Sequence, residues 1–171
     1  MTPETVGPLS RPVSVVQLPP EGLEYSVEAT GEERAAIAKD FKLPAIHSLT
    51  GRYKLTGTPK HVRVVGQVEA SITQICVVTL DPFDSTITET VDLEFAEPRP
   101  TTDQPQDEQG EYDPPDEILN GQVDLGALTA EFLALGLDPY PRKPGADFQH
   151  DAGDQGADSP FAALGKLKGS E

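Results

Sequence analysis

Residues 61–78 read HVRVVGQVEASITQICVV, and this stretch decides the fold because its two sets of alternate residues differ in polarity. Alternation with a period of two places each set on its own face of a β-strand. One register is largely apolar, and the other is mostly polar. The apolar register comprises Val62, Val64, Gly66, Val68, Ala70, Ile72 and Gln74. We therefore expect one long strand from about His61 to Val78, buried on one face, which suits antiparallel pairing.

Working outward, shorter β-type patterns flank this strand. They cover residues 13–18, 23–29, 46–55 and 85–95. Between the second and third of them, Thr30-Gly31-Glu32-Glu33 has the spacing of a capping box, and an amphipathic helix is expected from there to just before Pro44. The sequence thus predicts an α+β fold with an antiparallel sheet of about five strands and a helix packed across it. A barrel-like closure of that sheet is left open.

The later half begins with a stretch rich in proline and acidic residues, residues 97–116, which is typical of a linker without a packed core. A second helix is expected from Leu125, with Asp124 as its N-cap. Its apolar stripe is predicted to comprise Leu125, Leu128, Phe132, Leu135 and Leu137, broadened by Leu133.

The predicted organisation follows from these patterns. It consists of a flexible arm (1–12), the sheet with one helix (13–96), the acidic linker (97–116), a helix and Pro-rich coil that complete the domain (117–145), a mobile acidic stretch (146–158) and an amphipathic tail (159–171). In the tail, Ser159 is a candidate N-cap and Pro160 suits the first position of a short helix.

The tail is the candidate partner-binding element. Its predicted apolar edge consists of Phe161, Leu164 and Leu167, with Lys166 and Lys168 beside it. A helix this short needs a groove, which is offered either by a partner or by this protein's own core.

The composition limits the function. The chain of 171 residues has a formal net charge of −16, which repels phosphate backbones and attracts basic partners. A single cysteine excludes an intramolecular disulfide, and no apolar run is long enough for a membrane span. The N-terminus lacks the pattern of a signal peptide, so we expect a cytoplasmic protein. No nucleophile elbow, phosphate loop or metal-ligand spacing occurs, so neither an enzyme, a cofactor nor a small-molecule substrate is expected.

A local basic cluster is the exception to the acidic character. Arg52, Lys54, Lys60, His61 and Arg63 lie around one predicted hairpin, whereas Tyr53 is expected to point to the other face. An RNA-binding module that uses Arg52, Lys54 and Arg63 is therefore the alternative to a protein-binding factor.

Three segments together resemble the YceD family. The first is Ile75-Cys76-Val77-Val78-Thr79-Leu80-Asp81-Pro82-Phe83, which is similar to the family's Cys-x-x-Cys-x-x-Pro-Phe element. The second is Gly121-Gln122-Val123-Asp124-Leu125, and the third is Ser159-Pro160-Phe161-Ala162-Ala163-Leu164-Gly165-Lys166-Leu167. The segment from Asp138 to Pro144 and the long tail look like the alphaproteobacterial branch.

The resemblance implies a bacterial ribosome biogenesis factor that supports accumulation of large-subunit (23S) rRNA. With the acidic charge, it favours contact with a basic ribosomal protein or rRNA-processing factor, and at most weak or indirect contact with the rRNA. The sequence departs from the family at Thr79, where many members have a second cysteine. Because a thiolate zinc site needs about four ligands, the lone Cys76 predicts no structural zinc. Pro82 and Phe83 are expected to set the bend after the long strand, with Phe83 packed as an anchor.

Overall fold

The computed structural model describes residues 7–98 and 115–147. Its strands are β1 (Pro12–Ser14), β2 (Leu23–Glu28), β3 (Ala45–Thr58), β4 (His61–Ile75), β5 (Pro82–Ala96), β6 (Asp116–Glu117) and β7 (Gln122–Asp124). Its helices are α1 (Gly31–Asp40) and α2 (Leu125–Gly136). The predicted α+β class is confirmed.

A five-stranded sheet in the order β2-β3-β4-β5-β6 is the framework of the fold. The first four strands are antiparallel, and β6 joins the edge of β5 in parallel. The sheet is therefore mixed, and it is not closed into a barrel. The fifth strand is also not the one expected: β1 leaves the sheet and pairs with β7, with Val13 opposite Val123.

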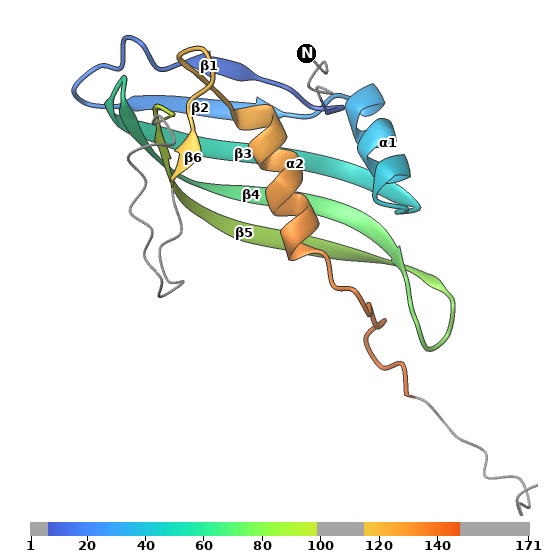
Figure 1. Ribbon diagram of the computed structural model, residues 1–171. Helices are drawn as coiled ribbons and strands as arrows, with labels where there is room; N and C mark the ends of the chain where they lie inside the picture. The colour runs from blue at the N-terminus through green and yellow to red at the C-terminus, as the bar shows by residue number, and fades with distance from the viewer. Residues whose placement is uncertain (1–6, 99–114, 148–171) are drawn as a thin grey trace, which may run out of the picture.

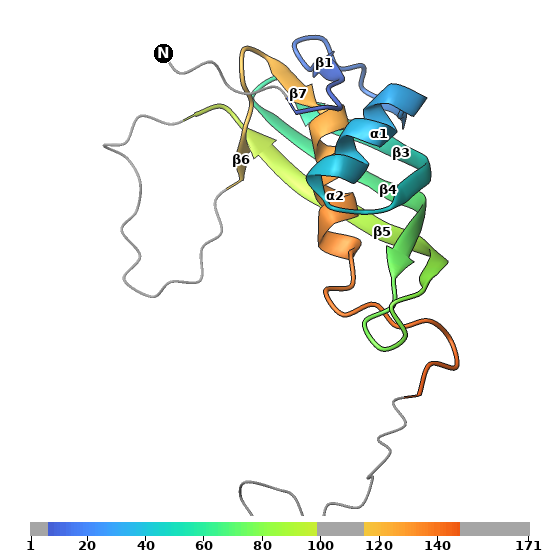
Figure 2. The same ribbon diagram turned by 90° about the vertical axis from the view of Figure 1, so that its right-hand side faces the viewer.

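Both helices lie on one face of this sheet (Figures 1 and 2). The buried register of β4 faces them, and Val62, Val64, Val68 and Ile72 are fully shielded from solvent. Leu125 and Leu133 of α2 complete this core from above. Alternation in the sequence thus correctly identified the face of β4 that packs beneath the helices.

A buried tyrosine fixes α2 to the sheet. The hydroxyl groups of Tyr53 and Thr129 are 2.7 Å apart, and that of Thr129 also donates to the carbonyl of Leu125. The Tyr53 ring lies between two glycines: a β-carbon on Gly51 or Gly66 would come within 2.6 or 2.7 Å of it, respectively. Burial raises the pKa of the Tyr53 phenol to about 12. Tyr53 therefore faces the helices, as predicted.

Local sequence signals correctly predicted where the two helices begin, but not every residue that the helices bury. Thr30 and Glu33 form the reciprocal capping box of α1, and Asp124 caps α2. Leu135, however, is 74% exposed, so its placement in the apolar stripe was wrong. A helix touches the sheet only along a strip of its surface, and Leu135 lies outside that strip.

The N-terminal segment also differs from the expectation. The sequence predicts a flexible arm over residues 1–12, yet Leu9 is fully buried and Pro12 begins β1. The arm interpretation therefore fails from Leu9 onward. Residues 1–6, together with the segments 99–114 and 148–171, lie outside the described residues.

Candidate functional site

The sheet face opposite the helices carries the predicted basic cluster. On this face, rows of residues run across β2, β3, β4 and β5: Ser26-Arg52-Gln67-Thr90, Glu24-Lys54-Val65-Asp92 and, from β3 onward, Thr56-Arg63-Glu94. Arg52, Lys54 and Arg63 are all exposed here, so the structure brings these three cations onto one surface. We call this surface the open face.

Carboxylates neutralise part of this cluster. The Arg63 guanidinium donates two hydrogen bonds to Asp92, at 2.8 and 2.7 Å. Such a bidentate ion pair is stronger than one held by a single hydrogen bond. This contact also lowers the pKa of the Asp92 carboxyl. Lys60 and His61 have Glu97 and Glu94 as their nearest acidic partners, at 3.8 and 3.4 Å.

Arg52 and Lys54 have no ion pair within the described residues. Acidic residues nevertheless lie near them: Glu24 is opposite Lys54, and Glu28 and Glu69 lie in the row next to that of Arg52. The open face is therefore a mixture of charges rather than a basic patch.

A second group on the open face escaped the sequence analysis. His47 Nε2 lies 2.8 Å from the Thr73 hydroxyl, which donates to Asp84 at 2.6 Å. A register shift between Ile46 and Ser48 marks a β-bulge at His47. The three residues come from three strands, so no local pattern could have joined them. His47 and Asp84 are at least half exposed, and the cluster is best explained as a surface polar network.

The family-like segment around Cys76 forms the loop between β4 and β5. The strand ends at Ile75 rather than at Val78, and the amide of Cys76 closes the loop by donating to the carbonyl of Asp81 at 2.9 Å. Leu80 adopts a left-handed conformation with φ of 61°. Pro82 is consequently the first residue of β5 rather than part of the bend.

The side chain of Cys76 is fully buried. Hydrogen bonds from Thr79 and from the backbone of Lys143 lower the pKa of its thiol to about 7. Nearby, the Val77 amide donates to the carbonyl of Pro141 at 2.9 Å. The loop thus rests against the coil that follows α2, although the two segments are far apart in the sequence.

This contact brings the coil after α2 beside the position at which the sequence departs from the family motif. The amide of Thr79 donates to the Cys76 sulfur at 3.5 Å, and the backbone of Lys143 contacts the same thiol. Within residues 7–98 and 115–147, no group of three or more His, Cys, Asp or Glu residues is arranged to hold a metal ion. Elemental analysis of the purified full chain tests the prediction that it contains no structural zinc.

Phe83 does not have the anchoring role expected of it. Its side chain is half-buried, it lies opposite Gln74 at the start of β5, and it is not part of the main core. The end of α2 meets β5 further along the strand, where Gly136 lies against Ile87 and Glu89.

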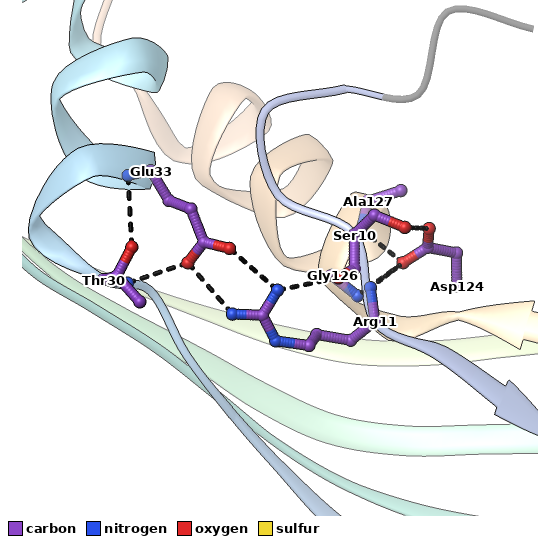
Figure 3. A network of polar contacts seen from close by, with 7 residues as sticks. All are labelled: Ser10, Arg11, Thr30, Glu33, Asp124, Gly126 and Ala127. Atoms are coloured by element: carbon purple, nitrogen blue, oxygen red, sulfur yellow. Dashed lines mark hydrogen bonds and ion pairs between the residues drawn. The ribbon is translucent and has the colours of Figure 1, made fainter.

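Asp124 is the family-motif residue with the clearest role (Figure 3). One carboxylate oxygen accepts from the amides of Gly126 and Ala127 at the start of α2, and from the amide of Arg11 at 2.7 Å. The other oxygen accepts from the Ser10 hydroxyl. These bonds hold the pKa of Asp124 below its usual value despite its partial burial. Asp124 therefore ties the N-terminal segment to α2.

The same network continues to α1. The Arg11 guanidinium donates to both oxygens of Glu33, at 2.8 and 3.0 Å, while Glu33 also accepts from the Thr30 amide. Gly126 makes room for the N-terminal segment, since a β-carbon there would lie 2.6 Å from the Arg11 nitrogen. We call Ser10, Arg11, Glu33 and Asp124 the cap network.

The other motif residues have structural positions. Gly121 has a φ of 70° in the turn before β7, which favours glycine, and its carbonyl accepts from the Val15 amide. Leu125 is fully buried. Pro160 and the partner-binding candidates Phe161, Leu164, Lys166, Leu167 and Lys168 lie outside the described residues.

These observations define a small α+β protein in which two helices cover one face of an open mixed sheet and the other face carries mixed charge. No helix among its described residues is long and apolar enough to cross a membrane. A family model described as "Large ribosomal RNA subunit accumulation protein YceD" matches residues 64–168, which is more than half of the chain. The chain belongs to the YceD family, and the recognition from its motifs is confirmed.

No curated protein and no solved structure matches the chain. The family match begins within β4 and includes the Cys76 loop, Asp124 and α2. Family membership links the chain to accumulation of large-subunit ribosomal RNA.

Proposed function

We propose that this chain is a non-catalytic ribosome biogenesis factor that supports 23S rRNA accumulation by binding a basic ribosomal protein or rRNA-processing factor in the cytoplasm. The family supplies the connection to the rRNA. The net charge of −16 supports a basic protein rather than bare RNA as the direct partner.

The bidentate ion pair between Arg63 and Asp92 is the observation that carries this proposal. A phosphate that used Arg63 would have to displace a carboxylate already held by two hydrogen bonds. Further carboxylates lie on the same face: Glu24 is opposite Lys54, Glu94 is opposite Arg63, and Glu69 lies in the row next to that of Arg52. The field of the open face thus opposes an approaching phosphate backbone.

Co-purification from cells, with and without ribonuclease, tests the proposal. We expect a basic assembly protein to stay bound to the tagged chain after ribonuclease treatment, and to be lost at high salt. If ribonuclease removes every specific partner, the contact is through RNA and the proposal of a protein partner is wrong.

RNA binding remains the second candidate because Arg52 and Lys54 lack ion pairs within the described part of the chain. A double Arg52→Gln, Lys54→Gln variant tests it against an rRNA fragment. Direct binding requires that the wild-type affinity fall steeply with salt, and that the variant lose both affinity and part of that salt dependence. A Thr88→Gln, Thr90→Gln variant on the same face is the control.

The tail is tested separately. Deletion of residues 159–171 is expected to leave folding largely unchanged and to weaken association with the assembly partner, because the expected binding edge is removed. Chemical denaturation and pull-down are measured on the same sample. Loss of several kcal/mol with unchanged pull-down would instead assign the tail to this protein's own core.

A further inference from the structure

The outer edge of β5 is long and unpaired within the described residues. This strand runs from Pro82 to Ala96 and pairs with β4 along its whole length. On its other side, β6 pairs only with Phe95 and Ala96. No other backbone hydrogen bond joins the β5 edge to a segment among residues 7–98 and 115–147. By contrast, the opposite edge strand of the sheet, β2, has only six residues.

The direction of the free backbone groups follows from the ends of the strand. The carbonyl of Ala96 accepts from Ile118 on the β6 side, whereas the amide of Glu97 donates to Lys60 on the β4 side. Along an antiparallel strand, successive residues turn their N–H and C=O groups to opposite sides. Since the register with β4 has no irregularity, Thr86, Thr88 and Thr90 direct their backbone groups to the outer edge.

The surroundings of this edge are acidic. The sequences of β5, β6 and α2 contain no lysine or arginine. Their carboxylates are Asp84, Glu89, Asp92, Glu94, Asp116, Glu117 and Glu131. Of these, Glu89, Asp116, Glu117 and Glu131 have no ion pair within the described residues.

Glu131 shows that this negative charge is not compensated. Although Glu131 is exposed, partial desolvation raises the pKa of its carboxyl, and the neighbouring Asp116 and Asp124 raise it further. A cation placed here would relieve that repulsion. A second copy of the chain would not, because pairing two β5 edges would bring acidic strands together.

We propose that the outer edge of β5 binds an extended, lysine- or arginine-rich segment of a protein partner as an added β-strand. Main-chain hydrogen bonds to Thr86, Thr88 and Thr90 would fix its direction, and its basic side chains would meet the carboxylates of β5, β6 and α2. This inference rests on the proposed function, for which it specifies the binding site.

A synthetic peptide of alternating lysine and valine is the probe, and a peptide of alternating glutamate and valine is its control. Binding to the full chain is followed by amide NMR and hydrogen exchange. We expect the lysine peptide alone to slow exchange at Thr86, Thr88 and Thr90, with an affinity that falls as salt rises.

The Thr88→Pro substitution distinguishes β-strand addition from electrostatic attraction between the basic peptide and the acidic surface. It removes one outward N–H group without removing a bond to β4, as proline does at a solvent-facing edge position. We expect at least a tenfold loss of peptide affinity, while the matched Thr88→Val variant binds like the wild type. Glu89→Gln and Glu131→Gln are each expected to weaken binding several-fold and to reduce its salt dependence.

Either of two peptide results would overturn the inference: no binding of the lysine peptide, or equal binding by Thr88→Pro with no slowed exchange at the three threonines. Should Thr88→Pro fail to fold, the exchange pattern of the wild type decides. If Thr88→Pro retains the basic assembly partner in the ribonuclease-treated pull-down, the edge is not its site, although the proposed function stands. If ribonuclease treatment removes that partner from the wild-type chain, the result counts against the proposed function instead.

Discussion

The two faces of the sheet come from the same strands, yet they follow different physical rules. Val64 and Val65 are neighbours on β4, but Val64 is fully buried beneath the helices whereas Val65 is 41% exposed on the open face. On the covered face, side chains meet neighbours from α2, β1 and the other strands. On the open face, they meet mostly polar and charged residues of adjacent strands.

The difference shows how an uncovered sheet face remains compatible with water. The open side of β5 carries Thr86, Thr88 and Thr90, which combine high β-propensity with polarity, together with the charged residues Asp92 and Glu94. The strand conformation is therefore supported without an apolar surface, and this face is available for contacts with other molecules.

The largest expected effect tests the two valines directly. Val64→Ala should lower the free energy of unfolding by about 2–3 kcal/mol, because it removes buried methyl groups and leaves a cavity. Val65→Ala should cost less than about 0.5–1 kcal/mol, because that side chain is already partly hydrated. Urea denaturation of both variants measures the contrast, and equal losses would contradict the assignment of the faces.

Asp124→Ala is expected to have the next largest effect, about 2 kcal/mol. The substitution removes the N-cap of α2 and leaves the Ser10 hydroxyl and the Arg11 amide without their acceptor. Asp124→Asn keeps one carbonyl oxygen for the cap and should lose less. Thermal unfolding of the two variants distinguishes the contribution of the helix cap from that of the negative charge. If Asp124→Ala unfolds at the same temperature as the wild type, the cap network is dispensable for stability.

Phe83→Ala sharpens the comparison at the end of the covered face. The ring is partly exposed and lies outside the main core, so we expect a loss of about 1–2 kcal/mol rather than the 3–5 kcal/mol typical of a core phenylalanine. The same denaturation assay measures it. A loss in the larger range would restore the anchoring role expected from the motif.

The smallest effect concerns the charge of Glu33. Its contact with Arg11 lowers the pKa of the Glu33 carboxyl from 4.5 to about 2. Because the folded-state pKa is the lower one, this contribution is present above about pH 4.5 and is lost as the pH falls toward 2. Glu33→Gln keeps the capping-box geometry but removes the charge.

Since both partners of this pair are partly exposed, we expect Glu33→Gln to cost at most about 1 kcal/mol at neutral pH. The difference from the wild type should shrink between pH 4.5 and 2 in acid titrations of stability. A constant difference across that range would show that the charge itself contributes nothing.

The sequence predicted what depends on local patterns. Alternation identified β2 to β5 and the facing of Tyr53, and short-range capping residues located the starts of α1 and α2. The loop after β4 was misplaced by three residues, because Cys76, Val77 and Val78 have β-propensity but leave the ladder where the chain turns.

Non-local pairing was beyond these patterns. Nothing in a three-residue segment specifies that Pro12–Ser14 will pair with Gln122–Asp124, or that Arg11 will reach Glu33. Such contacts depend on how α2 crosses the sheet, which is decided by packing. The open-face cations were found from sequence, but their neutralisation depends on cross-strand register, as for Arg63 and Asp92.

The pairing of β1 with β7 has a consequence for the order in which the chain folds as it is synthesised. Val13 finds its partner only after Val123 has been made and released, so β1 cannot form its strand pairing until β7 is available. Until then, the nascent chain contains the sheet, but β1 has no strand to pair with. Truncated nascent chains that stop before β7 should consequently remain open to proteolysis at residues 7–15.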